Sequence, residues 1–168
     1  MWKLSNEAYP ENPKREILMN IGEICNREVV VAYRDTRLVE AARLMREHHV
    51  GSLVIVVDRL SERVPVGIIT DRDIVVAVVA KELDPRALTV SDVINSGGVL
   101  VVREQDGLPD ALRLMREKGV RRVPVVTKSG ALAGIVTIDD LLELVADELH
   151  DFVRTAGQER VREAHARR

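Results

Sequence analysis

Apolar and polar positions alternate along the chain with two different periods. Apolar residues at Leu38, Ala41, Ala42 and Met45 have the i, i+3, i+4, i+7 spacing of one helix face. Short runs of branched apolar residues lie before and after this segment, as buried strands require. The pattern predicts the order β-α-β-β-α: strand 29–32, a helix from 38, strands 53–57 and 66–69, and a second helix from 71.

The same order occurs again about 70 residues further along. Residues 38–56 and 108–126 are identical at nine of nineteen positions, and RLMRE occurs unchanged in both. GIITDRDI (67–74) then matches GIVTIDDL (134–141). The second copy is therefore predicted to contain strands 99–102, 123–127 and 132–136 and helices from 108 and 138, while a longer polar loop separates the last two strands of the first copy.

This duplication divides the chain into an N-terminal arm (1–16), repeat 1 (17–86), repeat 2 (87–150) and a C-terminal helical tail (151–168). A unit of about 65 residues cannot cover both faces of a small sheet by itself. We therefore expect an α/β fold in which two β-α-β-β-α repeats pack sheet to sheet with pseudo-twofold symmetry. A groove between such halves is a favoured place for a ligand.

The last helix carries an apolar stripe that runs past the end of the repeat. We expect it to pack on the sheet of repeat 2 as far as Leu149. Beyond that point, Phe152 and Val153 need another apolar surface, for which a second subunit is a candidate.

Composition narrows the classes of partner. The 25 basic and 27 acidic residues nearly balance, and aromatic residues make up only 2%; the chain therefore lacks the basic excess and stacking surface of a protein that binds a nucleic-acid polymer. The N-terminal residues form no apolar signal segment, and no apolar run approaches the roughly 18 residues of a membrane span. With Cys25 as the only cysteine, a cytoplasmic protein without membrane contact is predicted.

A Thr-x-x-Asp motif follows the last strand of each repeat, at Thr70–Asp73 and Thr137–Asp140. One interpretation is a helix cap, in which the threonine and aspartate exchange hydrogen bonds with the first turn. The other is a ligand site, where the aspartate accepts the hydroxyls of a ribose and the threonine lies near a phosphate. One aspartate can fill both roles.

Together, GIITDRD, GIVTIDD and GVRRVPVV (119–126) resemble tandem cystathionine-β-synthase (CBS) domains, the Bateman module, over residues 21–149. The resemblance implies a regulatory, non-catalytic module that binds an adenosine-containing ligand such as AMP, ATP, NAD or S-adenosylmethionine between the repeats, with AMP or ATP as first choices and no required cofactor. It further implies a homodimer and a regulated protein partner whose identity is unknown. The implied ligand-binding residues are Thr36, Ala41, Val66, Thr70, Arg72, Asp73, Arg121, Arg122, Ile135, Thr137 and Asp140.

The two implied sites differ in charge. Asp106 of the second copy stands where the first has Thr36, and by pseudo-symmetry it would face the Thr70/Asp73 site. A carboxylate there would repel a phosphorylated ligand, an effect that Arg72 could offset. We therefore expect the Thr137/Asp140 site to be the tighter one.

Other interpretations stay open. Arg121 and Arg122 could be solvated or paired with an acid at the strand entrance. The chain could be a structural or interaction module with empty sites, or a metal- or redox-responsive protein that uses Cys25, His48 and His49. An enzyme is not predicted, because the sequence has no Gly-x-Ser-x-Gly elbow, Walker loop or GxGxxG motif.

Overall fold

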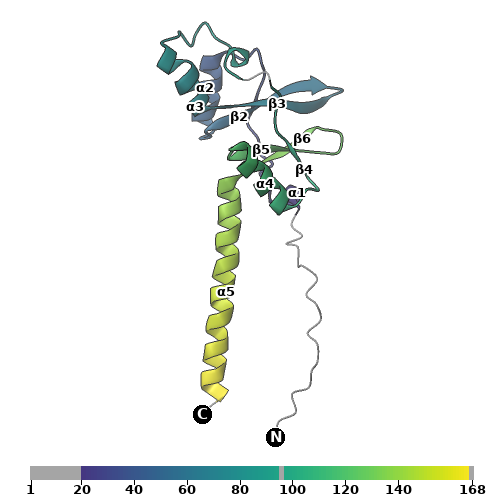
Figure 1. The fold of residues 1–168 in the computed structure, drawn as a ribbon, viewed down its shortest axis with the longest axis vertical. Coiled ribbons are helices and arrows are strands. Elements are labelled where there is room, and N and C mark those ends of the chain that lie inside the picture. Colours follow the sequence, from purple (N-terminus) through teal and green to yellow (C-terminus); the bar gives the residue numbers. More distant parts are fainter. Residues whose placement is uncertain (1–19, 95–96, 167–168) are drawn as a thin grey trace.

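A computed structural model of the chain describes residues 20–94 and 97–166; the predicted arm at 1–16 lies outside this range. Both copies have the predicted β-α-β-β-α order (Figure 1). The first consists of β1 (Val31–Ala32), α2 (Leu38–Glu47), β2 (Ser52–Arg59), β3 (Glu62–Thr70) and α3 (Asp71–Ala77). The second consists of β4 (Val102–Arg103), α4 (Leu108–Lys118), β5 (Arg122–Val126), β6 (Leu132–Thr137) and α5 (Ile138–Ala166). Shorter helical turns are α1 (Ile21–Ile24), η1 (Val79–Lys81) and η2 (Val90–Asp92).

Each repeat forms a three-stranded sheet with the same topology. The short first strand pairs parallel to the middle strand, and the middle and last strands form an antiparallel hairpin. The predicted long polar loop of repeat 1 is wrong: β2 and β3 extend through it and turn at Leu60 and Ser61, both at positive φ (48° and 68°). Positive φ at both central residues is the geometry of a type I′ turn, whose twist matches that of paired strands.

Helices α2 and α4 are both followed by a residue in the left-handed conformation. Gly119 after α4 and His49 after α2 both take positive φ, at 64° and 54°, which is the left-handed conformation that closes many helices.

The middle strands are buried on both faces, which confirms the sheet-to-sheet packing. On β2, Leu53 and Ile55 belong to the core shared with the helices of repeat 1, while Val54 and Val56 are equally buried on the opposite face. That opposite face lies toward the other sheet, where β3 contacts β6 (Figure 1). Branched aliphatic side chains fill such a pleated, two-sided space efficiently, which explains the abundance of valine.

The two repeats exchange their leading segments. Ile21, ahead of the first strand of repeat 1, is fully buried in the core of repeat 2, and its N–H donates to the carbonyl of Asp106 (2.9 Å). Val90, ahead of the first strand of repeat 2, is fully buried in the core of repeat 1, and its N–H donates to the carbonyl of Thr36 (2.9 Å). Each core is therefore completed by the leading segment of the other repeat.

Helix α5 departs from the expected packing. Leu141 is buried (3% exposed), but Leu142, Val145 and Leu149 are 49–60% exposed, so the prediction that the stripe packs on the sheet as far as Leu149 is wrong. Figure 1 shows the reason: α5 extends away from the two sheets after its first turn. No helix in the described part of the chain combines the length and the apolar character needed to cross a membrane.

Candidate functional site

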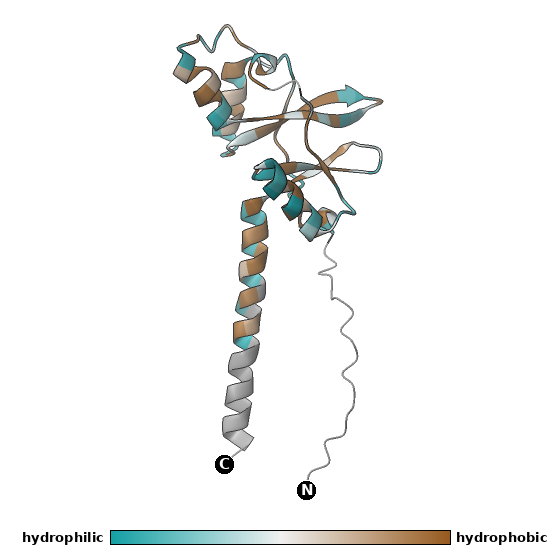
Figure 2. Ribbon diagram, in the orientation of Figure 1, coloured by the Kyte–Doolittle hydropathy of each residue, from teal (hydrophilic) through white to brown (hydrophobic). Residues whose placement is uncertain are grey.

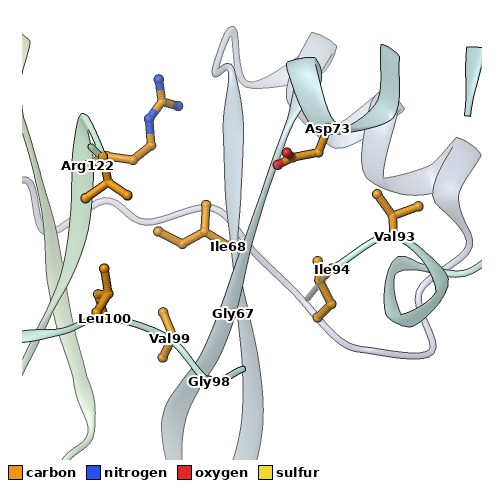
Figure 3. A pocket seen from close by; sticks show the side chains of 10 residues that line it. Gly67, Ile68, Asp73, Val93, Ile94, Gly98, Val99, Leu100 and Arg122 are labelled. Atoms are coloured by element: carbon orange, nitrogen blue, oxygen red, sulfur yellow. The ribbon is translucent and has the colours of Figure 1, made fainter. Parts of the chain in front are cut away.

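Two cavities lie at corresponding places between the repeats. The first, of about 260 Å³, is closed on one side by β3 and α3 of repeat 1 and on the other by the segment that leads into β4. Its lining consists of Gly67, Ile68, Asp73, Val93, Ile94, Gly98, Val99, Leu100, Val120 and Arg122. Figure 3 shows the side chains of Asp73 and Arg122 on either side of Ile68, the aspartate from α3 and the arginine from β5.

The second cavity, of about 190 Å³, is built from the equivalent elements of the opposite repeats. Its lining consists of Asn26, Glu28, Val29, Val30, Val50, Gly51, Ser52, Val54, Arg122, Ile135, Thr137 and Asp140. Ile135 occupies the place of Ile68, and Asp140 the place of Asp73, at the offset of 67 residues found in the sequence. Each cavity thus has walls from both repeats.

The Thr-x-x-Asp motifs form closed capping boxes. The N–H and hydroxyl of Thr70 both donate to Oδ2 of Asp73 (2.8 and 2.7 Å), and the Asp73 N–H donates back to the threonine hydroxyl (3.1 Å). Thr137 and Asp140 repeat these contacts at 2.8, 2.8 and 3.2 Å. The capping interpretation is therefore correct. Because these bonds use Oδ2, the other oxygen of each carboxylate stays available to a ligand.

A third box of the same kind lies outside both cavities. The N–H and hydroxyl of Thr89 donate to Oδ2 of Asp92 (2.8 and 2.7 Å) at the start of η2. The backbone N–H, followed by the hydroxyl, lowers the pKa of the Asp92 carboxyl, because both donors stabilise its charged form. Asp92 therefore provides a structural counterpart of Asp73 and Asp140 that lines neither cavity.

The two neighbouring arginines have different surroundings. Arg121 is exposed and pairs with Asp139 (3.0 Å), so the simple ion-pair interpretation holds for it. Arg122 is partly buried, lines both cavities, and has no carboxylate within 4.0 Å among the described residues. No other basic residue appears in either lining.

The remaining predicted ligand residues lie elsewhere. The Thr36 hydroxyl accepts a hydrogen bond from the N–H of Tyr33 (2.9 Å), and Ala41 is fully buried in the core of repeat 1. Val66 packs on the same core, and Arg72 is exposed at the start of α3. The structure brings Asp73, Arg122, Ile135, Thr137 and Asp140 into the cavity linings. The other six predicted residues lie outside them: Thr36, Ala41, Val66, Thr70, Arg72 and Arg121.

Asp106 also lies outside both linings. Its Oδ2 accepts a hydrogen bond from the N–H of Arg103 (2.7 Å), so it closes a turn as Thr36 does in repeat 1. Apart from the capping aspartates Asp73 and Asp140, the acid in the linings is Glu28, in the second cavity. The charge argument for a tighter second site thus loses its stated basis, and the ranking stays a prediction.

The sequence did not point to several cavity residues. These belong to the apolar stretches ahead of β1 and β4, which include Val29–Val30 and Val99–Leu100. Their pattern predicts buried strands, and only the placement of one sheet over the other turns their side chains toward a cavity. For Ile68 the sequence did offer a signal, because the alignment of the two repeats places it opposite Ile135, an implied ligand residue.

Cys25 and Asn26 pack closely against Gly134 in β6. A Cβ at Gly134 would lie 2.7 Å from the Cys25 sulfur and 2.8 Å from the Asn26 carbonyl oxygen, so only glycine fits there. Burial raises the pKa of the Cys25 thiol, which keeps it protonated and poorly nucleophilic at neutral pH. Among the described residues, no group of three or more His, Cys, Asp or Glu side chains is arranged to hold a metal ion.

The family model described as "CBS domain" matches residues 21–80 and 90–147. An uncharacterized protein of Methanopyrus kandleri, MK0525, is 39% identical over 126 residues, which cover 75% of this chain and 62% of that protein. The chain thus spans under two thirds of that relative.

Two solved structures share the fold. Hypoxic Response Protein I, in a crystal structure with two coordinated zinc ions, has a TM-score of 0.63 at 34% identity, covering 74% of this chain and 97% of that one. The CBS domain pair of protein MJ0100, in complex with 5′-methylthioadenosine and S-adenosyl-L-methionine, has a TM-score of 0.63 at 26% identity, covering 75% and 98%.

The fold defines an internally duplicated α/β module with two cavities between its halves. With both repeats matched, the chain belongs to the CBS-domain family.

Proposed function

We propose that this chain is a non-catalytic regulatory module that binds an adenosine-containing nucleotide, with AMP or ATP as first candidates, in the cavities between its CBS repeats. The observation that carries the proposal is the lining of these cavities. Each combines a branched aliphatic wall, a helix-capping aspartate and Arg122. A nucleotide offers a matching order of groups: a flat apolar base, a diol and an anionic phosphate.

The second cavity illustrates the fit. Val30, Val54 and Ile135 supply apolar contacts for an adenine, which aromatic stacking cannot provide in a chain so poor in aromatic residues. The free oxygen of Asp140 can accept hydrogen bonds from the ribose hydroxyls, and the Arg122 guanidinium can pair with a phosphate. Both cavities are smaller than the about 300 Å³ at the lower end of ligand pockets, so the phosphate would lie at the mouth.

Such a ligand would act by linking the repeats. Because each cavity has walls from both, a bound nucleotide favours the relative placement of the repeats that contacts it best. It can shift that equilibrium only as far as its affinities for the two placements differ. The unidentified protein partner would then recognise the favoured placement.

The module is further proposed to form a homodimer through α5. The exposed residues Leu142, Val145, Leu149 and Phe152 are spaced by 3, 4 and 3 positions, which is the heptad spacing of a coiled-coil seam. Figure 2 shows apolar residues along the projecting part of this helix. A second copy presents the identical seam and is therefore a self-complementary occupant.

Nucleotide binding can be tested by calorimetry and thermal unfolding with AMP, ADP, ATP, NAD and S-adenosylmethionine. A ligand at 100 times its Kd should stabilise the protein by about 2.7 kcal/mol. Asp73→Asn and Asp140→Asn should each weaken binding at their own cavity by about tenfold or more, because each removes an acceptor for the ribose hydroxyls.

Asp92→Asn is the matched control, since it alters the same capping contacts without touching a cavity. It should leave nucleotide affinity unchanged. The absence of stabilisation by every adenosine compound would refute the proposal. An equal loss of affinity in Asp92→Asn would show that the aspartates act through folding alone.

A further inference from the structure

The linings of the two cavities contain a single basic residue. Arg122 lines both, and its Nη1 atom lies 3.7 Å from the position of a Cβ built on Gly51, a residue of the second cavity. Its partner in the pseudo-symmetry is Ser52: Arg122 pairs with Thr137 in β5–β6, and Ser52 pairs with Thr70 in β2–β3. The two copies thus share this strand position, but only the second copy has a cation there.

The surrounding charges make this cation important for anionic ligands. Asp73 lines the first cavity, and Glu28 and Asp140 line the second. The carboxylate of Asp71 also lies close by, with Oδ2 at 3.3 Å from the Cβ built on Gly51. Arg121 is engaged with Asp139 and lies outside both linings. A phosphate entering either cavity therefore meets carboxylates and one available guanidinium.

We propose that Arg122 couples the two cavities negatively, so that a phosphorylated ligand held by Arg122 in one cavity weakens the binding of a phosphorylated ligand in the other. The inference rests on the proposed nucleotide binding and adds its regulation. A guanidinium offers five N–H donors in a rigid fork, and bidentate pairing with one phosphate commits that fork to one direction. The second phosphate then has no cation and lies near the first, which repels it.

This coupling would give the module a graded response. The first nucleotide would bind at low concentration, and the second would bind only when the concentration is much higher. An uncharged ligand such as adenosine would not compete for Arg122, so its two binding steps would be independent.

The test is a calorimetric titration of AMP into the intact chain and three variants. In the unaltered protein, we expect two binding steps whose Kd values differ by about tenfold or more, a step of about 1.4 kcal/mol per factor of ten. Ser52→Arg adds a second cation at the pseudo-symmetric strand position, so that two phosphates no longer compete for Arg122, and should bring the two Kd values within about threefold. Arg122→Gln should weaken the first step to the level of the second.

Arg121→Gln is the control, because it removes the neighbouring positive charge without altering either lining, and it should preserve the two separated steps. Adenosine, titrated in parallel, should give two Kd values that differ by about threefold or less, because it does not compete for Arg122. Should AMP occupy only one cavity per chain, Ser52→Arg must restore the second for the inference to stand.

Three results would overturn the coupling: equal AMP steps in the unaltered protein, separated steps that persist in Ser52→Arg, or AMP and adenosine steps with the same ratio. In each of these cases AMP still binds, so the proposed nucleotide binding would stand without the coupling. If neither adenosine nor any adenosine nucleotide binds, the proposed function fails, and the coupling fails with it.

Discussion

The two repeats have the same order of strands and helices but differ in the residues that line their cavities. Repeat 1 has Ser52 at the position where repeat 2 has Arg122, and Glu28 lines the second cavity where the corresponding Gly98 lines the first. Their closing helices also differ, since α3 has 7 residues and α5 has 29. The comparison teaches that the duplication preserved the positions that build cores and caps, while the charged and protruding positions diverged.

The largest expected effect concerns the closing helices. Combining Leu149→Asp with Phe152→Asp should convert the proposed homodimer to a monomer, because the seam would bury unpaired carboxylates. Size-exclusion chromatography with light scattering measures the change. His150→Asp places a carboxylate on α5 at an exposed position outside the seam and should leave the dimer intact. A monomeric unaltered protein at micromolar concentration would refute the proposed dimer.

The exchanged leading segments offer the next test. Ile21→Ala should lower the free energy of unfolding by about 2–5 kcal/mol, as is typical for a fully buried isoleucine. Val90→Ala should cost less, because fewer buried methylene groups are lost, at about 0.8 kcal/mol each. Urea denaturation measures both, with the fully exposed Leu60→Ala as control. A loss below 1 kcal/mol for Ile21→Ala would contradict the exchange.

The last prediction compares two equivalent glycines. Gly134→Ala should destabilise the fold by about 1–3 kcal/mol, because its Cβ would meet a backbone carbonyl and the Cys25 sulfur. Gly67→Ala should cost less, since its nearest obstacle is the terminal Cδ1 of Ile94 at 3.2 Å, which can move. Thermal unfolding of the two variants ranks them. The reverse order would show that the strand adjusts more readily at Gly134.

Most of the fold could be predicted because local patterns encode it. Leu38, Ala41 and Met45 of the predicted helix face are buried, while Ala42 of that face is exposed. The capping boxes form between residues three apart. The outer part of the β2–β3 hairpin was missed because its charged residues resemble a loop, although exposed strand ends tolerate charge. The resemblance implied Thr36 as a ligand residue, and pseudo-symmetry placed Asp106 at the Thr70/Asp73 site; the structure gives both a role in closing turns, outside the cavity linings.

By itself, the sequence determined the duplication, the order of elements, the capping aspartates and the membership in the CBS-domain family. These features depend on short-range periodicity and on residues close together in the chain. The tertiary structure alone decided which repeat each leading segment completes, which apolar side chains face a cavity, and that Arg122 lines both cavities while Arg121 lines neither. Such choices depend on how one sheet lies over the other, and residues about 70 positions apart meet only after that packing has formed.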